Sequence, residues 1–346
     1  MKVLIAAAGS GGHIIPAQVV AEELTENGFS VLFAGHNLSQ NPYFDKKKWG
    51  YVDIKAAPPS FSLRRGCSFA YSTLCGTKQA WRLLREYPFV IGFGSYHTVP
   101  ILFAALLRRT PFVLYEANAR PGKVIRLFSP YAHWTGCHFK EASKRLRGKT
   151  ECVSHPLRSS LFPLPEKKKS RSYFGLPPSG KTVLVIGGSQ GTALFSSLIP
   201  AALKEMEEKP SVIHLAGHQA DTSSLASEYE KRGIQACVKP FEENMAFAYS
   251  ACDAVVSRSG ASVISEIERS QTPALYVPFA KAADNHQKFN AMEAISNENN
   301  LLIEEHDASP KRVAAALSTI LFSLNKNRKF CAPNQRFSTL LLESFN

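Results

Sequence analysis

The sequence has few features of an exported or membrane-spanning protein. Its seven cysteines are odd in number, widely spaced and without a CxxC pair. This pattern matches neither a disulfide framework nor a zinc site, and it predicts reduced thiols in a cytosolic protein. The longest candidate span, VPILFAALL from Val99, is far shorter than the roughly 20 residues of a membrane-crossing helix. The apolar run from Val3 to Ala8 is too short for a signal peptide and is followed at once by glycines, so a buried first strand is expected.

Several familiar nucleotide and metal motifs are also missing. The first glycine loop, residues 9–13, is neither the GxGxxG of dinucleotide enzymes nor the GxxxxGK[ST] of a P-loop. The stretch FSVLFAGHNLS, which begins at Phe29, lacks the acid that would bind a dinucleotide's ribose. The chain has no DxD, the carboxylate pair that holds a diphosphate through a metal ion in many sugar transferases. We therefore expect a metal-independent site with no cofactor.

The composition is that of a globular protein with a basic surplus. A chain of 346 residues, 45% hydrophobic and 20% charged, is long enough for two cores. The net charge of +13 favours polyanions, anionic lipid surfaces or phosphorylated substrates as partners. Because the sequence has no recognition helix, zinc-finger spacing or RNA-binding aromatic signature, we expect no nucleic-acid partner.

Apolar runs alternate with amphipathic helical stretches, which predicts an α/β fold with parallel sheets covered on both faces. The first helix is expected to open at His13 and to end at Asn27-Gly28. The polar segment 163–181 is the best linker candidate, and its lysine run is expected to be solvated. The expected strands are 2–8, 30–34, 51–54, 89–93, 111–115, 133–137, 182–187, 211–216, 235–238, 253–257 and 273–277.

A strand, a glycine loop and a helix follow one another in both halves, at 2–24 and 181–200. Such a loop gathers backbone N–H groups at the positive end of a helix dipole and suits phosphate. His13 beside the first loop is either a proton-transfer group or a capping or packing histidine. The second loop, 187–192, adds hydroxyl and amide donors for a diphosphate or sugar, although it also fits a tight strand–helix turn.

The third motif, DAVVSRSGASVISEIE at 253–268, is more specific. A phosphate on the helix that starts near Ala261 would place a ribose close to Glu266, whose carboxylate can accept hydrogen bonds from its hydroxyls. The alternative is that Glu266 is a solvated helix acid. Downstream, the polar segment 278–291 contains Asn285, His286, Gln287 and Asn290, which suit sugar hydroxyls but also an ordinary hydrophilic helix start.

In order along the chain, these motifs resemble the MurG family of glycosyltransferase family 28, N-acetylglucosaminyltransferases of bacterial cell-wall synthesis. The resemblance implies a GT-B fold, with two Rossmann-like domains facing each other across a cleft. Residues 1–157 would form the acceptor domain, with a peripheral membrane face, and 158–346 the UDP-GlcNAc domain, whose last helix at about 333–346 can pack back on the first. The matching segments are the loop with His13, GFGSY at 92–96, YEAN at 115–118, HPLR at 155–158, GGSQG at 187–191, SRSGAS…SE at 257–266 and DNHQ…NA at 284–291.

The resemblance also implies roles for individual residues. His13 is the first candidate for the general base and Glu116 the second, Glu266 would bind the ribose, and the uracil would lie near 241–245. The residues implied to contact UDP-GlcNAc are Ser10, Gly11, Gly12, Asn118, Arg158, Ser189, Glu242, Ala261, Ser262, Val263, Ile264, Ser265, Glu266 and Gln287.

The sequence departs from the family pattern at six positions, which affects individual hydrogen bonds rather than the reaction. Val263 and Ser10 stand where threonine is common, Ala8 replaces a glycine, Ala117 a glutamine and His155 an asparagine, and Glu242 occupies a usually apolar site.

The implied reaction is an inverting transfer of GlcNAc from UDP-GlcNAc to the 4-hydroxyl of MurNAc in undecaprenyl-pyrophosphoryl-MurNAc-pentapeptide. The alternatives are a UDP-GlcNAc 2-epimerase, a GT-B transferase with another lipid acceptor, and a non-catalytic sugar-binding protein. We expect a peripheral protein on the cytoplasmic face of the bacterial plasma membrane. Basic and apolar side chains between Phe61 and Phe89 would dock it on anionic lipid. The alternative is that the apolar side chains of this segment pack into the core of the first domain. These side chains are Arg64, Arg65, Lys78, Arg82 and Arg85 among Leu63, Phe69, Tyr71, Leu74, Trp81 and Leu84.

Overall fold

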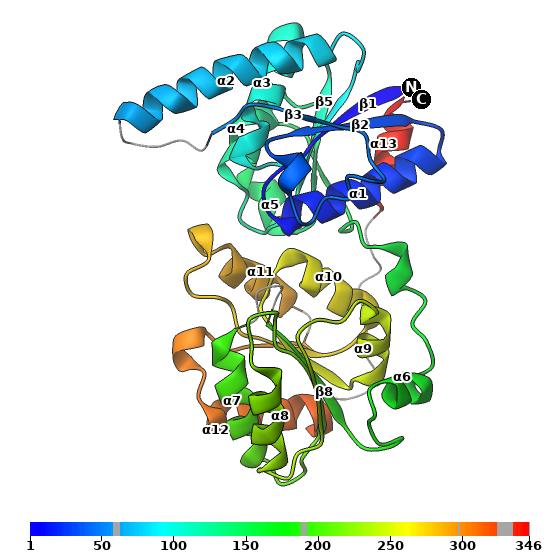
Figure 1. Ribbon diagram of the computed structural model, residues 1–346, viewed down its shortest axis with the longest axis vertical. Coiled ribbons are helices and arrows are strands. Elements are labelled where there is room, and N and C mark those ends of the chain that lie inside the picture. Colours follow the sequence, from blue (N-terminus) through cyan, green and yellow to red (C-terminus); the bar gives the residue numbers. More distant parts are fainter. Residues whose placement is uncertain (58–62, 188–191, 297, 324–334, 346) are drawn as a thin grey trace. The chain divides into compact units, whose positions relative to one another are not determined.

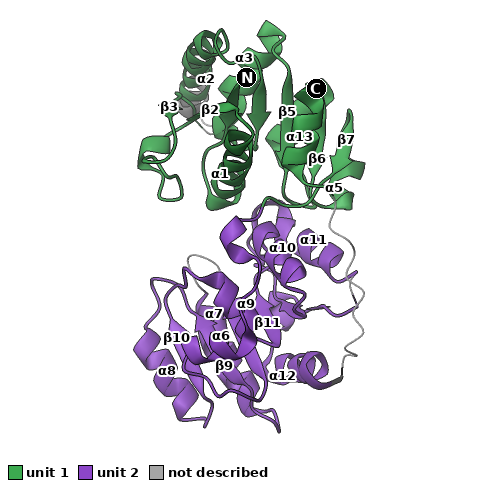
Figure 2. Ribbon diagram, turned by 90° about the vertical axis from the view of Figure 1, so that its right-hand side faces the viewer, with its two compact units in different colours: residues 1–156, 333–346 green, residues 157–332 purple. Residues whose placement is uncertain are grey.

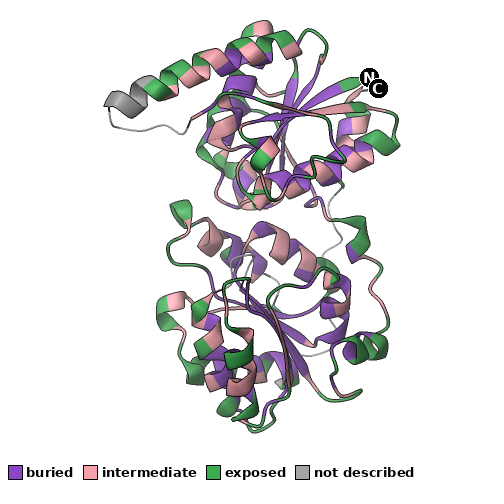
Figure 3. Cartoon of the chain, viewed as in Figure 1, coloured by how far each residue is buried: buried purple, intermediate pink, exposed green. Residues whose placement is uncertain are grey.

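Two compact units make up the chain (Figure 2). The structure, a computed structural model, describes residues 1–57, 63–187, 192–296, 298–323 and 335–345. The first unit contains residues 1–156 and 333–346, and the second contains 157–332. Each has one parallel sheet, as the sequence predicted, with buried strands and helices that expose one side (Figure 3).

The first sheet has the strand order β3-β2-β1-β4-β5-β6-β7 (Figure 1). The order reverses between β1 and β4, and ligands of such sheets bind beyond the carboxyl ends of the strands at this point. β7 was not predicted, because its three residues include no sustained apolar run. The strands are β1 Lys2–Ala6, β2 Ser30–Gly35, β3 Tyr51–Asp53, β4 Val90–Gly92, β5 Phe112–Glu116, β6 Thr135–Cys137 and β7 Thr150–Cys152.

Alternate residues of β1 serve two separate cores on the two faces of the first sheet. Val3 and Ile5 belong to one cluster, and Leu4 and Ala6 to the other. The first cluster lies under α1 (Gly11–Glu26) and α13 (Phe337–Phe345), and the second under α2 (Leu63–Leu83), α3 (Val99–Arg108) and α4 (Lys123–Phe128). The prediction that the first helix opens at His13 was wrong by two residues, because the helix already begins at Gly11.

The helix α13 completes the first unit although it follows the whole second unit in the sequence. The buried Phe337 ring packs against Tyr115 and Trp134, with centroids 5.1 and 5.2 Å away. A Cβ atom on Gly136 would lie 2.6 Å from the Phe337 ring, so β6 needs glycine here. Trp134 Nε1 also donates a hydrogen bond to Ser344 Oγ at 3.1 Å.

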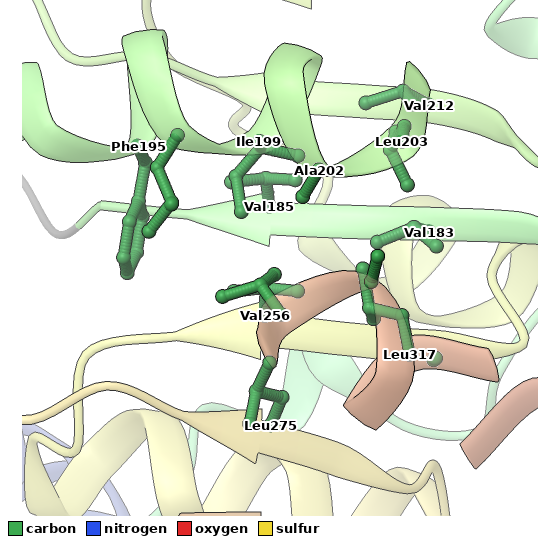
Figure 4. Close-up of a cluster of buried hydrophobic side chains, with 14 of the residues drawn as sticks. Val183, Val185, Phe195, Ile199, Ala202, Leu203, Val212, Val256, Leu275 and Leu317 are labelled. Carbon is green, nitrogen blue, oxygen red and sulfur yellow. The ribbon is translucent and has the colours of Figure 1, made fainter. Parts of the chain in front are cut away.

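The second sheet has the order β10-β9-β8-β11-β12-β13. Strand side chains such as Val183, Val256 and Leu275 pack against Ile199 and Leu317 of the covering helices (Figure 4). β13 was not predicted, since it has only two residues. The strands are β8 Thr182–Ile186, β9 Ser211–Leu215, β10 Ala236–Lys239, β11 Ala254–Ser257, β12 Ala274–Tyr276 and β13 Leu301–Leu302. The α-helices of the second unit are α6 Lys167–Tyr173, α7 Ala193–Lys204, α8 Thr222–Glu230, α9 Met245–Ala251, α10 Ala261–Ser270, α11 His286–Ala294 and α12 Pro310–Ser318. A further short helix, α5 (Lys140–Arg145), belongs to the first unit.

The prediction that 163–181 links the two units was wrong, because this segment lies inside the second unit, which begins at residue 157, and contains a helix. α6 (Lys167–Tyr173) packs on α9, and Lys167 Nζ lies 2.7 Å from Asp253 Oδ1. The buried Arg171 donates to Pro177 O and Ser179 O at 2.8 and 3.0 Å, which folds the following loop against the helix. The lysine run remains on the exposed side, as predicted.

Candidate active site

The loop between β1 and α1 presents the positive end of a helix. Gly9 has φ +90°, a left-handed conformation that favours glycine, and Ser10 is the N-cap residue of α1. Asn41 Nδ2 donates to Gly9 O at 2.8 Å and holds the loop in place. No acidic residue lies in the first turn of α1, so the N–H groups at Gly11 and Gly12 face no competing carboxylate from that turn.

His13 is oriented by a backbone carbonyl from the neighbouring strand. Its Nδ1 lies 2.7 Å from Phe93 O, so Nδ1 carries the proton that is donated to this oxygen. In the neutral ring Nε2 is then an acceptor, the form required of a general base. The alternative that His13 caps helix α1 is wrong, because Ser10 occupies the N-cap position and the His13 ring bonds to Phe93 O of another segment.

Glu116, the second candidate base, is buried at the end of β5. Its carboxylate accepts bonds from Asn118 N at 2.8 Å, Asn118 Nδ2 at 3.3 Å and Gly122 N at 2.8 Å. Burial raises the pKa of Glu116 to about 7, although these N–H donors oppose the shift. The carboxylate fixes the loop 117–122 and the Asn118 side chain, so the geometry favours His13 as the base.

His155 is buried in the first unit. Tyr115 Oη and His155 Nδ1 are 2.7 Å apart, and the His155 ring lies 5.5 Å from that of His138. Burial, and secondarily the neighbouring His138, lower the pKa of His155 well below its ordinary value. Burial also lowers the pKa of His138, to about 4, so both histidines are neutral near pH 7.

In the second unit, Glu266 is held by a buried tyrosine. Tyr249 Oη donates to Glu266 Oε2 at 2.7 Å. Burial raises the pKa of Glu266, while the Tyr249 hydrogen bond and the charge of Arg158 oppose the rise. Glu266 is half-buried, so the alternative of a solvated helix acid is wrong.

The other implied residues of α10 divide by burial. Gly260 is the N-cap, and no acid lies in the first turn. Ser262 and Val263 are partly exposed there, whereas Ala261, Ile264 and Ser265 are buried. At this helix end only Ser262 and Val263, of these five residues, can therefore offer a side chain to a nucleotide. The backbone N–H groups of the first turn remain available to bind a phosphate.

The buried Arg258, which belongs to the third motif but was not among the predicted site residues, links three segments around α10. The Arg258 Nη1 donates to Val277 O, Pro278 O and Glu305 Oε2 at 3.0, 3.1 and 3.0 Å. Its Nη2 donates to Thr192 Oγ1 at 3.1 Å. A charged residue directly after the apolar strand run was the available signal. Gln287 joins the same region, since its Oε1 accepts from Phe279 N at 3.0 Å and its carbonyl accepts from Ser259 Oγ at 2.8 Å.

Glu242 is buried and engaged within the protein. Its carboxylate accepts from Tyr173 Oη at 3.2 Å and Asn244 N at 2.8 Å, and it forms an ion pair with Lys239. It therefore shapes the loop beside Phe241, whose exposed ring stacks on His218 with centroids 5.7 Å apart.

The implied residues fall into two groups, one on each unit. Ser10, Gly11, Gly12 and His13 share one loop, with Glu116 and Asn118 at a neighbouring strand end. Glu266 interacts electrostatically with the exposed Arg158, and Gln287 bonds to the segment that leads into α10. Ser189 lies outside the described residues. Across the described ranges, no three His, Cys, Asp or Glu side chains converge as metal ligands, and no helix is long and apolar enough to cross a membrane.

Both halves of the chain match domains of one known protein family. Residues 3–135 match the glycosyltransferase family 28 N-terminal domain, and residues 182–339 match its C-terminal domain. The UDP-N-acetylglucosamine–N-acetylmuramyl-(pentapeptide) pyrophosphoryl-undecaprenol N-acetylglucosamine transferase of Protochlamydia amoebophila is 35% identical over 331 residues, which cover 92% of this chain and 87% of that protein.

Two solved structures bear on the competing functions. MurG of Acinetobacter baumannii is similar with a TM-score of 0.76 and 25% identity, over 92% of this chain and 90% of that one. The UDP-GlcNAc 2-epimerase of Neisseria meningitidis has a TM-score of 0.66 over 100% of this chain and 99% of that one, but only 14% identity. The epimerase thus shares the fold alone, whereas the transferases match in sequence as well.

Proposed function

Because the chain belongs to the MurG family of glycosyltransferase family 28, we propose a reaction in which His13 activates the acceptor hydroxyl. The chain is an N-acetylglucosaminyltransferase of peptidoglycan synthesis with the two Rossmann-like domains of a GT-B enzyme. It moves GlcNAc from UDP-GlcNAc to N-acetylmuramyl-(pentapeptide) pyrophosphoryl-undecaprenol.

The observation that carries the proposed mechanism is the bond between His13 Nδ1 and Phe93 O. It leaves Nε2 to take the proton from the 4-hydroxyl of the muramyl sugar as that oxygen attacks the anomeric carbon, with inversion. The Phe93 carbonyl then stabilises the imidazolium. A positioned base of this kind contributes about 10²–10⁴-fold to the rate.

Departure of UDP requires stabilisation of a negative diphosphate. We assign this role to the N-terminus of α10 and to Arg158, whose charge already acts on Glu266. Glu266 would accept from the ribose hydroxyls, and Gln287, held by Phe279 N, would contact the sugar. Ser10, Gly11, Gly12 and Asn118 are proposed as contacts from the first unit, and Ser189 as a further diphosphate contact.

Peripheral membrane docking is the second part of the proposal, through what we call the α2–α3 surface. Tyr71, Leu74, Lys78, Trp81 and Arg85 recur at helical spacing along one exposed stripe. Tyr71 and Leu74 are 64% and 72% exposed, so they do not pack into the core, whereas Ala80 and Leu84 do. Phe103 and Leu107 of α3 are also exposed. Leu63, Arg64 and Arg65 belong to the predicted patch, but their side chains, like Phe61, lie outside the described residues.

Basic groups mixed with exposed apolar ones suit an anionic leaflet. Arg108 lies over the Trp81 ring, 5.0 Å from its centroid, which adds a cation to this surface. We therefore propose the cytoplasmic face of the plasma membrane as the place where the enzyme meets its lipid-linked acceptor.

Measurement of UDP release, with and without lipid-linked muramyl-pentapeptide, tests the transferase function. We expect release only when both substrates are present. Consumption of UDP-GlcNAc without UDP release would favour the epimerase, and a protein that consumes no donor under either condition would contradict both activities.

A further inference from the structure

Three arginine side chains line a pocket in the first unit that belongs to neither group described above. Its volume is about 350 Å³, and it is lined by Arg120, Pro121, Arg126 and Arg145. Arg120 and Pro121 lie in the loop after β5, Arg126 lies in α4, and Arg145 is the last residue of α5 (Figure 1). Pockets of this size hold part of a small-molecule ligand.

The side chains are presented by anchored segments. Glu116 accepts the N–H groups of Asn118 and Gly122, both at 2.8 Å, and so fixes the loop that carries Arg120 at the end of β5. Pro121 is buried, and Arg126 N donates to Gly122 O at 3.0 Å where α4 begins. The fold therefore brings arginines from the loop after β5, from α4 and from α5 to one pocket.

The charge of the pocket is positive. Glu141 accepts from Arg145 Nε at 2.9 Å and lies 3.4 Å from Lys144 Nζ, so its carboxylate pairs with two cations of the same helix. An exposed ion pair four residues apart on a helix is weak, so a multivalent anion can replace it. Mutual repulsion of the three guanidinium groups decreases when an anion lies between them.

Arginine also restricts the chemistry of the ligand. Its planar fork binds carboxylate or phosphate through two parallel hydrogen bonds. The acceptor of the transferase carries both types of group, a pyrophosphoryl link and a pentapeptide with its terminal carboxylate. Arg120 lies two residues beyond Asn118, on the same loop, so the pocket adjoins the proposed active site.

We propose that Arg120, Arg126 and Arg145 form a subsite that binds an oxyanion of the acceptor. The proposal rests on the proposed transferase function and extends it to the anionic part of the second substrate. The donor diphosphate is assigned to the other unit, so the subsite acts on acceptor affinity and leaves donor affinity unchanged.

The test compares Arg120→Gln/Arg126→Gln with a control, Arg147→Gln, which removes one exposed arginine of the same unit outside the pocket. UDP release by the full-length enzyme is measured while each substrate is varied. We expect the KM for acceptor to rise by about tenfold or more in the double variant, as charge-assisted bonds are lost. The KM of the double variant for UDP-GlcNAc should stay within about twofold of the wild-type value, and so should both KM values of the control.

Two further arms identify the oxyanion. An acceptor whose peptide ends in an amide should raise the KM of the wild type but not of the double variant if the pocket binds the carboxylate. If it binds the diphosphate instead, inorganic pyrophosphate should compete with acceptor in the wild type, and the double variant should lose this inhibition. Either result supports the subsite.

An acceptor KM in Arg120→Gln/Arg126→Gln equal to that of Arg147→Gln would overturn the proposal. Thermal unfolding and calorimetric UDP binding check that the double variant is folded. If it is not folded, Arg145→Gln at the exposed end of α5 takes its place, with the same expected and contradicting results. Absence of acceptor-dependent UDP release in the wild type and the control would instead refute the proposed function itself.

Discussion

Tyr249 Oη donates a 2.7 Å hydrogen bond to Glu266 Oε2. The tyrosine is buried in α9, and the glutamate is half-buried on α10. One carboxylate oxygen is thereby held by the protein, so the carboxylate has a fixed orientation before a nucleotide binds.

Replacement of Glu266 by alanine should weaken the binding of UDP and of UDP-GlcNAc alike, since both carry the ribose. Ribose hydroxyls that lose their acceptor cost roughly 1–3 kcal/mol, or about ten- to a hundredfold in affinity. Calorimetry measures both ligands, with Glu230→Ala on the exposed side of α8 as control. Unchanged UDP affinity in Glu266→Ala would leave the carboxylate without a role in nucleotide binding.

His13→Ala should lower kcat by more than about tenfold with little change in the KM for UDP-GlcNAc, as expected for a lost general base. Glu116→Gln should chiefly lower the melting temperature, because its amide keeps one acceptor oxygen but turns an NH2 donor towards N–H groups that the other carboxylate oxygen accepts. Steady-state kinetics and thermal unfolding separate the two roles. A pure increase in KM for His13→Ala would make this histidine a binding residue.

Acid should destabilise the second unit through His214. Burial lowers the pKa of His214 from 6.5 to about 4, so the unfolded state binds the proton first. Stability is therefore lost as the pH falls from about 6.5 towards 4, by about 2 kcal/mol at pH 5. Burial raises the pKa of Glu268 to about 7, so its contribution to the free energy of unfolding has the opposite pH dependence: it decreases as the pH rises.

The variant His214→Phe/Tyr229→Phe removes the titrating ring and its 2.8 Å partner together. Its free energy of unfolding should change less between pH 7.5 and pH 5 than that of the wild type, by about 2 kcal/mol. Urea unfolding followed by circular dichroism is the appropriate measurement, because the three tryptophans (Trp49, Trp81 and Trp134) all lie in the first unit. Equal pH dependence in both proteins would refute the assignment.

Charge reversal on the α2–α3 surface should abolish binding to vesicles that contain anionic lipid. Each basic group near such a surface contributes about 1 kcal/mol. Cosedimentation of Lys78→Glu/Arg82→Glu/Arg85→Glu is compared with Lys144→Glu/Arg147→Glu/Lys149→Glu, an equal change of charge elsewhere in the unit. High salt should weaken wild-type binding as well. Loss of binding in the second triple variant alone would place the membrane surface there instead.

Activity should survive treatment with EDTA, since the sequence has no DxD and the helix ends and Arg158 are proposed to hold the diphosphate. UDP release before and after chelation is the measurement. Loss of turnover that magnesium or manganese restores would refute the metal-independent mechanism.

The sequence predicted those features whose causes are local. Strands such as β8 are continuous apolar runs because both of their faces are buried, and every predicted strand occurs. α6 was missed because its basic residues show no apolar period, and its position depends on α9 and Asp253. For the same reason the motif singled out Glu266 as a candidate, whereas its hydrogen-bond partner Tyr249, on another helix, was not predicted.

The packing of α13 in the first unit has a consequence for folding during synthesis. Residues 1–156 are translated before the second unit, but the space beside Gly136 is filled only when Phe337 is available. Until then the nascent first unit exposes apolar surface around Tyr115 and Trp134, a state in which a chain is prone to aggregate or to need a chaperone. The unit that is translated first is therefore completed only after the second has been translated.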